Sequence, residues 1–142
     1  MKDVVIVSAC RTAIGAFGGS LKDLNAAKLG SAVITELLRR TGISPDIIDD
    51  VRFGCCSDPV DALNVARISA LLAGVPDTVP AATINRVCIS GMEAVISGMA
   101  MIQSDMADII LAGGTEHMSS IPYSIPSARW GGRLQDQALV DN

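Results

Sequence analysis

Residues 81–114 have the sequence AATINRVCISGMEAVISGMAMIQSDMADIILAGG. Two short apolar runs, at 81–87 and 108–112, flank an apolar segment at 90–103 that is too long for a strand. The pattern predicts a strand, a helix and a second strand, and such a unit places its two strands parallel in one sheet. Because the helix is apolar on every side, we expect it at the centre of a domain.

The same alternation extends toward the N-terminus. Val4-Val5-Ile6-Val7 is an unbroken apolar run, rich in β-branched residues, of the kind found in a strand covered on both faces. The predicted strands lie at 2–9, 51–56, 81–87 and 108–112, and the predicted helices run from 26 to about 40, from 62 to 73 and from 90 to 103. This order predicts a layered α/β fold with a largely parallel sheet. After Gly114 the regularity stops.

Composition and charge exclude several classes of protein. The chain has 142 residues, 49% of them apolar, and its 15 acidic and 11 basic side chains give a net charge of −4. Nucleic-acid binding needs clustered cations, and disorder needs low hydrophobicity, so we expect neither. No apolar stretch approaches the ~20 residues of a membrane helix. We expect no secretory signal in the first ten residues, because their apolar stretch is short and the acidic Asp3 precedes it. The expected location is therefore the cytoplasm.

The spacing of the four cysteines does not indicate a metal site. Their spacing matches neither a zinc ribbon nor a C-x-x-C redox pair, and the chain has a single histidine, His117. We therefore predict no bound metal. Cys10, Cys55 and Cys56 are predicted to be small buried core residues.

Cys88 differs from the other cysteines because it lies where the strand at 81–87 gives way to the helix at 90–103. The N-terminus of a helix has unpaired N–H groups and a positive dipole end, which stabilise a thiolate. The Cys88 N–H is a candidate hydrogen-bond donor to an oxyanion. Ser90 and Gly91 are compact and leave room for a substrate. Position alone leaves a catalytic nucleophile and an inert core cysteine equally open.

Four collinear stretches resemble the N-terminal part of the thiolases, the family that makes or cleaves 3-ketoacyl-CoA through an acyl-cysteine. They are VVIVSACRTAIGAFGGSLKD at 4–23, NVARISALLAGVP at 64–76, TVPAATINRVCISGMEAV at 78–95 and ADIILAGGTEHMSSIPYSIPSARWG at 107–131. The resemblance implies that Cys88 is the acyl-accepting nucleophile. It also implies a layered α-β-α fold made of two similar halves, with a loop domain inserted in the first half.

The resemblance divides the chain at Gly114. It implies that residues 1–114 are the core of the N-terminal half, with a sheet that a later strand and helix would complete, and that residues 115–142 begin the loop domain. Tyr123 and Trp130 would then serve loop packing and subunit contacts. An incomplete sheet leaves an exposed edge, so we predict that the chain is not a self-sufficient monomer.

The implied activity is acyl transfer between acyl-CoA thioesters, by 3-ketoacyl-CoA thiolysis or by Claisen condensation, within fatty acid metabolism. The family's Gly-His-Pro, Asn-Glu-Ala-Phe and second-cysteine motifs do not occur here. We expect a split subunit or a truncated chain, inactive alone, that forms a homo-oligomer, pairs with a complementary C-terminal thiolase chain, or both. Coenzyme A thioester is the expected substrate, with no covalently bound cofactor; the sequence identifies no CoA-binding residue.

Two other functions stay open: a non-catalytic thiolase-like fragment retained for assembly, and a ketoacyl- or hydroxymethylglutaryl-type synthase relative. The NVAR and AGGTEHMS segments disfavour the synthase. His117 is the only histidine available as a base, and we predict that it is packed instead. Asp58, Asp61 and Glu116 are interpreted as solvated or capping groups rather than as acid/base catalysts.

Three residues near Cys88 carry predictions of their own. Ile89 stands where the family favours a smaller residue and is predicted to crowd the acyl site. Glu93 would disfavour a nearby thiolate unless it faces away. Arg86 is interpreted either as pairing with a carboxylate across a dimer interface or as an ordinary surface arginine.

Overall fold

The computed structural model describes residues 2–57 and 59–142. Its main sheet has three parallel strands in the spatial order β2-β1-β3. The strands are β1 (Asp50–Gly54), β2 (Ala81–Ile84) and β3 (Ile110–Gly114), and the helices are α1 (Ala26–Thr41), α2 (Val65–Leu72) and α3 (Ser90–Gln103). Short 3-10 turns lie at Pro45–Ile47, Met118–Ser120 and Ala128–Trp130.

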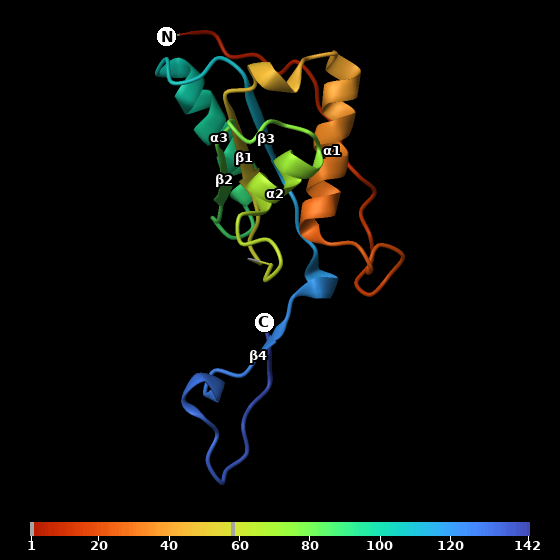
Figure 1. Ribbon diagram of the computed structural model, residues 1–142, viewed down its shortest axis with the longest axis vertical. Coiled ribbons are helices and arrows are strands. Elements are labelled where there is room, and N and C mark those ends of the chain that lie inside the picture. The colour runs from red at the N-terminus through yellow and green to blue at the C-terminus, as the bar shows by residue number, and fades with distance from the viewer. Residues whose placement is uncertain (1, 58) are drawn as a thin grey trace.

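Strand order explains the layering. The chain steps from β1 to β2 on one side, then crosses back over β1 to reach β3. Because crossovers between parallel strands are right-handed, these two opposite steps place α2 and α3 on opposite faces of the sheet. Figure 1 shows α3 on one side and α1 with α2 on the other. The predicted α-β-α layering is therefore confirmed.

The core fills the space between the sheet and the α1–α2 layer. Val51 and Phe53 alternate along β1 toward this layer and are 0% and 2% exposed. They pack in one cluster with Ile34 of α1 and with Ala66 and Ala70 of α2. Burying each large apolar side chain contributes about 1.5–3 kcal/mol. The inward-facing residues of β1 and the apolar faces of α1 and α2 thus pack together in one layer of the core.

The predicted boundaries of α1 are confirmed by its caps. The Asn25 side chain accepts a hydrogen bond from the Lys28 N–H at 2.8 Å, as an N-cap does. Gly42 follows the helix with φ of 67°, and its N–H donates to the Leu38 carbonyl at 2.9 Å. A side chain at Gly42 would strain this left-handed turn.

The strand predicted at 2–9 is wrong for the described residues. Val5, Ile6 and Val7 are 72–80% exposed and join no strand ladder. The segment instead runs past the sheet, with the Lys2 ammonium 2.8 Å from a carboxylate oxygen of Asp105 and of Asp108; these hydrogen bonds raise the pKa of Lys2. A β-branched run favours an extended backbone, but a strand also needs a neighbouring edge with which to pair.

α3 is not surrounded by the described residues, contrary to the prediction. Its inner face lies on the sheet, where Gly98 is close to Ile110 and where Ala94 is fully buried. On its outer face, Val95 and Met99 are 44% and 42% exposed. Residue type shows that a helix is apolar all round, but the number of layers packed against it depends on the rest of the fold.

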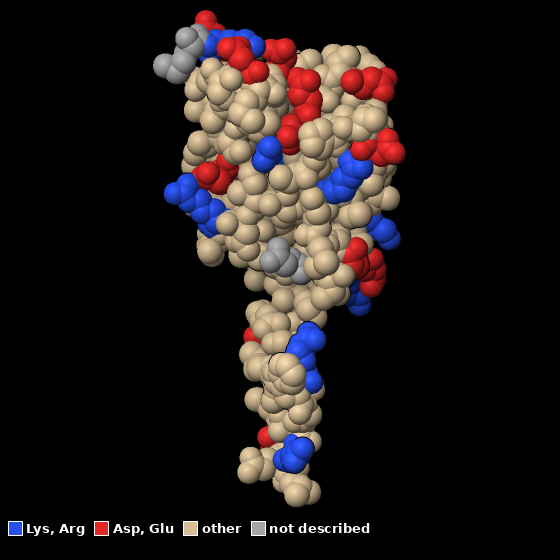
Figure 2. Space-filling model, turned by 60° about the vertical axis from the view of Figure 1, so that its left-hand side comes forward, with Lys and Arg blue, Asp and Glu red and all other residues tan. Residues whose placement is uncertain are grey.

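Beyond Gly114 the chain leaves the body and forms a narrow arm (Figures 1 and 2). Two short antiparallel strands, β4 (Tyr123–Ser124) and β5 (Val140–Asp141), close the base of the arm. Trp130 within it is 86% exposed. The division at 114 into a core and a loop domain stays a prediction. No helix within the described residues has the length and apolar character needed to cross a membrane.

Candidate active site

The sheet has a crevice where its strand order reverses. The chain goes from β1 to β2 on one side and then crosses back over β1 to β3 on the other, which makes the β1–β3 edge the switch point of the sheet. Ligands bind outside the carboxyl ends of strands at such switch points in open α/β sheets. Gly54 ends β1 and Gly114 ends β3, paired side by side. A Cβ on Gly54 would lie 2.3 Å from the Ser90 carbonyl carbon, so only glycine lets α3 begin directly above the strand end.

Cys88 opens onto an open cavity of about 1010 Å³ at these strand ends. Its thiol is exposed, as is that of Cys56. The cavity is also lined by the strand-end glycines, by the start of α3 and by the segment after β3: Gly54, Ser57, Val87, Ser90, Gly91, Gly114, Thr115, Glu116, Met118, Ile121, Pro122 and Asn142. The exposed thiol argues against the alternative that Cys88 is an inert core residue.

The beginning of α3 faces this cavity without a side-chain cap. Ile89 occupies the N-cap position and provides no side-chain hydrogen bond to the first turn. The Ser90 N–H of that turn donates to the Val87 carbonyl at 3.1 Å, and the dipole of the 14-residue helix favours negative charge at this end. Ile89 is 49% exposed and is not among the described residues that line the cavity, so the crowding predicted for it is not observed.

Glu93 and Arg86 pair with each other. An Arg86 guanidinium N–H donates to the Glu93 carboxylate, seven residues further along the chain. The pair balances the negative charge that was predicted to disfavour a thiolate at Cys88. Arg86 thus has its carboxylate partner inside this chain.

Glu116 anchors the loop that follows β1. Its carboxylate accepts hydrogen bonds from the N–H groups of Cys56 at 2.8 Å and of Ser57 at 3.2 Å, and also from the Ser57 hydroxyl. Glu116 is thus a capping group, as predicted, although it lies in the wall of the Cys88 cavity. Burial, and secondarily the Glu116 charge, raise the pKa of the Cys55 thiol.

The cysteine predictions are confirmed only for Cys55, which is 1% exposed. Cys56 is exposed because the chain leaves β1 at Gly54 and its next residues alternate between the core and the cavity. Cys10 is half-buried, and its thiol donates to the Val33 carbonyl at 3.3 Å. Adjacent residues at a strand end face opposite sides, so two neighbouring cysteines cannot both enter one core.

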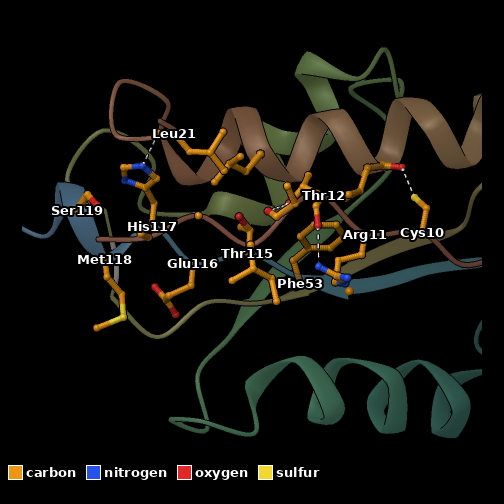
Figure 3. Close-up of a pocket in the computed structure, with 18 of the residues that line it drawn as sticks. Cys10, Arg11, Thr12, Leu21, Phe53, Thr115, Glu116, His117, Met118 and Ser119 are labelled. Carbon is orange, nitrogen blue, oxygen red and sulfur yellow. Dashed lines mark hydrogen bonds between the residues drawn. The ribbon is translucent and has the colours of Figure 1, made fainter. Parts of the chain in front are cut away.

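His117 is packed, as predicted, and does not face Cys88. It is 7% exposed, with Nε2 3.0 Å from the Leu21 carbonyl oxygen and Nδ1 2.8 Å from the Ser120 hydroxyl. A carbonyl can only accept, so Nε2 carries the hydrogen. Figure 3 shows the ring turned toward Leu21 in a second cavity, of about 470 Å³, between α1 and β3. His117 thus ties the end of β3 to the loop before α1.

Asp61, another carboxylate considered from the sequence, does not line the Cys88 cavity. Asp61 accepts a hydrogen bond from the Asn25 side chain at 2.7 Å and so supports the N-cap of α1. Asp58 lies outside the described residues. Within residues 2–57 and 59–142, no three His, Cys, Asp or Glu side chains gather in an arrangement that could hold a metal ion.

Sequence reasoning missed most of the cavity wall. Cys56 and Ser57 on one side, and Met118, Ile121 and Pro122 on the other, reach the cavity from two strands. The carboxyl ends of these strands, Gly54 and Gly114, are paired although they are 60 residues apart in the sequence. The carboxyl ends of parallel strands meet at one edge of the sheet. The residues that follow each predicted strand are therefore the ones that the sequence could have indicated as lining the cavity.

The protein is a three-layer α/β protein. It carries an exposed cysteine at a strand–helix turn, in a cavity at the switch point of its sheet. The model of a known family, described as "Thiolase, N-terminal domain", matches residues 4–142. The chain belongs to the thiolase family.

Curated relatives match almost all of the chain. It is 48% identical over 133 residues to an acetyl-CoA acetyltransferase of Syntrophomonas wolfei, covering 94% of the chain and 34% of the relative. It is 44% identical over 142 residues to beta-ketothiolase BktB of Cupriavidus necator, covering 99% of the chain and 36% of that relative. A probable acetyl-CoA acyltransferase of Staphylococcus aureus is 40% identical over 100% of the chain and 36% of its own length. The chain thus spans about a third of the relatives it matches.

Proposed function

We propose that this chain carries the nucleophile of a thiolase that transfers acyl groups between acyl-CoA thioesters through an acyl-cysteine on Cys88. The observation that carries the proposal is the exposed Cys88 thiol, two residues before α3 and open to a cavity at the sheet's switch point. The names of the relatives, acetyl-CoA acetyltransferase and beta-ketothiolase, support this reaction class.

The chemistry runs in two half-reactions. In thiolysis, the Cys88 thiolate attacks the 3-keto carbon of a 3-ketoacyl-CoA; a new S–C bond forms, and the C2–C3 bond breaks. The electron pair of that bond remains on the acetyl-CoA fragment as an enolate, which takes up a proton and leaves. The thiolate of free coenzyme A then attacks the acyl-cysteine, so that the acyl group moves to coenzyme A and Cys88 is restored as a thiolate.

The start of α3 stabilises charge in both steps. The Cys88 N–H is proposed to donate to the oxyanion of each tetrahedral intermediate, supported by the positive dipole end of the helix. A general base for the Cys88 proton and an acid for the enolate are still required. We assign both to sequence beyond these residues, because His117 faces another cavity and Glu116 is occupied by the 55–57 loop.

The proposal has consequences for substrate and partners. The substrate is an acyl-CoA, and no covalently bound cofactor is required. The remaining groups come from further sequence, either in the same polypeptide or in a complementary chain, and the working enzyme is an oligomer in the cytoplasm that serves fatty acid metabolism. The exposed apolar face of α3 supports burial against such added sequence.

The test is acyl labelling of the complete enzyme with radioactive acetyl-CoA, followed by peptide mapping. We expect label on the peptide that contains Cys88, and its loss in Cys88→Ala without a change in thermal unfolding. Cys10→Ala is the matched control, because Cys10 lies outside the Cys88 cavity, and it should keep the label. Label that survives Cys88→Ala would refute the assignment.

A further inference from the structure

The turn that carries Cys88 contains a backbone conformation that its sequence disfavours. Val87 has φ of 53°, in the left-handed region. A β-branched residue there is an outlier, because its Cβ crowds the following carbonyl group. Such conformations persist only where surrounding contacts hold them, and they cluster at functional sites. The structure must therefore contain groups that hold Val87, and the hydrogen bonds around it identify them.

Asn85 holds the turn from the side of the strands. Its side-chain oxygen accepts a hydrogen bond from the Val87 N–H at 3.0 Å. Its side-chain nitrogen donates to the Cys56 carbonyl at 3.1 Å, in the loop after β1. One side chain thus fixes the peptide group before Val87 and ties the turn to the opposite wall of the cavity.

Ser90 holds the same turn from the side of the helix. Its side chain is buried, with the residue 5% exposed. The hydroxyl accepts from the Arg86 N–H at 2.8 Å and donates to the Val87 carbonyl at 2.5 Å, and the Ser90 N–H donates to the same carbonyl at 3.1 Å. The two peptide groups that flank Val87 are therefore both fixed by side chains, one by Asn85 and the other by Ser90.

We propose that Asn85 and Ser90 are positioning residues for the acyl transfer proposed above. They hold Val87 in its left-handed conformation, and this conformation turns the next residue, Cys88, toward the cavity. Neither residue touches the reacting atoms. Without them, Val87 relaxes to a negative φ, and the Cys88 sulfur and N–H both move away from the substrate carbonyl. This inference rests on the proposed function of Cys88.

The test compares Asn85→Ala and Ser90→Ala with the parent in the complete enzyme, using acetyl-CoA and a 3-ketoacyl-CoA. Because a displacement of about 1 Å costs about 100-fold in rate, we expect kcat to fall by about 10- to 100-fold. KM should stay within about 3-fold, since the cavity itself remains. Matched controls are Asn64→Ala, which removes the N-cap of α2, and Ser104→Ala, at the other end of α3. Both should leave kcat unchanged.

The decisive variant is Val87→Gly, because glycine adopts positive φ without strain. Combined with Asn85→Ala or Ser90→Ala, it should restore kcat to within about 3-fold of the Val87→Gly enzyme. A residue needed only for stability would show no such rescue. The proposal is overturned if the alanine variants keep the parent kcat, or if Val87→Gly rescues neither. Failure of the proposed function gives a different result: turnover that survives Cys88→Ala.

Discussion

Gly54→Ala is expected to displace the cysteine-bearing turn from below. The added Cβ would lie 2.3 Å from the Ser90 carbonyl carbon and 2.4 Å from the Gly91 nitrogen. Ordinary contacts at such atoms are about 3.4 Å or longer, so the start of α3 must move by about 1 Å. The strand cannot yield instead, because Gly54 is held between Ile84 of β2 and Gly114 of β3.

Two magnitudes follow from this displacement. Overpacking against backbone costs about 1–3 kcal/mol, and the backbone contact places Gly54→Ala at the upper end of that range. A shift of about 1 Å in the turn that carries Cys88 should lower the acyl-transfer kcat by about 100-fold. Denaturant unfolding measures the first quantity, and steady-state turnover of acetyl-CoA by the complete enzyme measures the second.

Gly30→Ala is the matched control. A Cβ on Gly30 would lie 2.3 Å from the Ser69 hydroxyl oxygen and 3.3 Å from Phe53, in the layer on the far side of the sheet. It should lower the free energy of unfolding, as Gly54→Ala does, yet leave kcat within about 3-fold of the parent. The reasoning is refuted if Gly54→Ala keeps the parent kcat, or if Gly30→Ala loses as much activity as Gly54→Ala.

Two further predictions concern titratable groups. Because burial raises the pKa of Cys55, iodoacetamide at neutral pH should modify the exposed Cys56 much faster than Cys55, as peptide mass spectrometry can measure; equal rates would contradict the burial. Hydrogen bonds from the Ile109 and Asp108 N–H groups lower the pKa of Asp49 in the folded state. The ionised Asp49 carboxylate therefore stabilises the folded protein fully above the unfolded pKa of about 3.9, and this stabilisation is lost as the pH falls through the lower folded pKa. Asp49→Ala should therefore destabilise the protein at pH 7, with a difference from the parent that shrinks below about pH 4, and a constant difference would contradict this account.

Most local structure was predictable from sequence. The predicted helix at 90–103 has the observed ends, and the predicted strands at 51–56, 81–87 and 108–112 lie within a few residues of the observed ones. Asn25 and Gly42 flank the helix predicted from residue 26 and cap it in the structure, because capping depends on residues next to the backbone groups that they satisfy. The resemblance to thiolases, carried by four collinear stretches, likewise needed no coordinates.

Partners distant in sequence were not predictable in the same way. The β-branched run at 4–7 predicts a buried strand, but pairing depends on an edge supplied elsewhere in the fold, and the run is exposed. The Arg86–Glu93 pair and the Glu116 anchor to the 55–57 loop depend on where the turn and the strand ends come together. His117 was expected to be packed, but its Leu21 partner lies 96 residues away.

The sequence by itself determined the order of strands and helices, their caps, the family and the position of Cys88 at a strand–helix turn. The tertiary structure decided which face of α3 is covered, which groups line the cavity and how Val87 is held. The physical reason is the range of the interactions. Periodicity and capping act within a few residues, whereas the cavity forms where parallel strands end side by side, and only the strand order β2-β1-β3 brings those ends together.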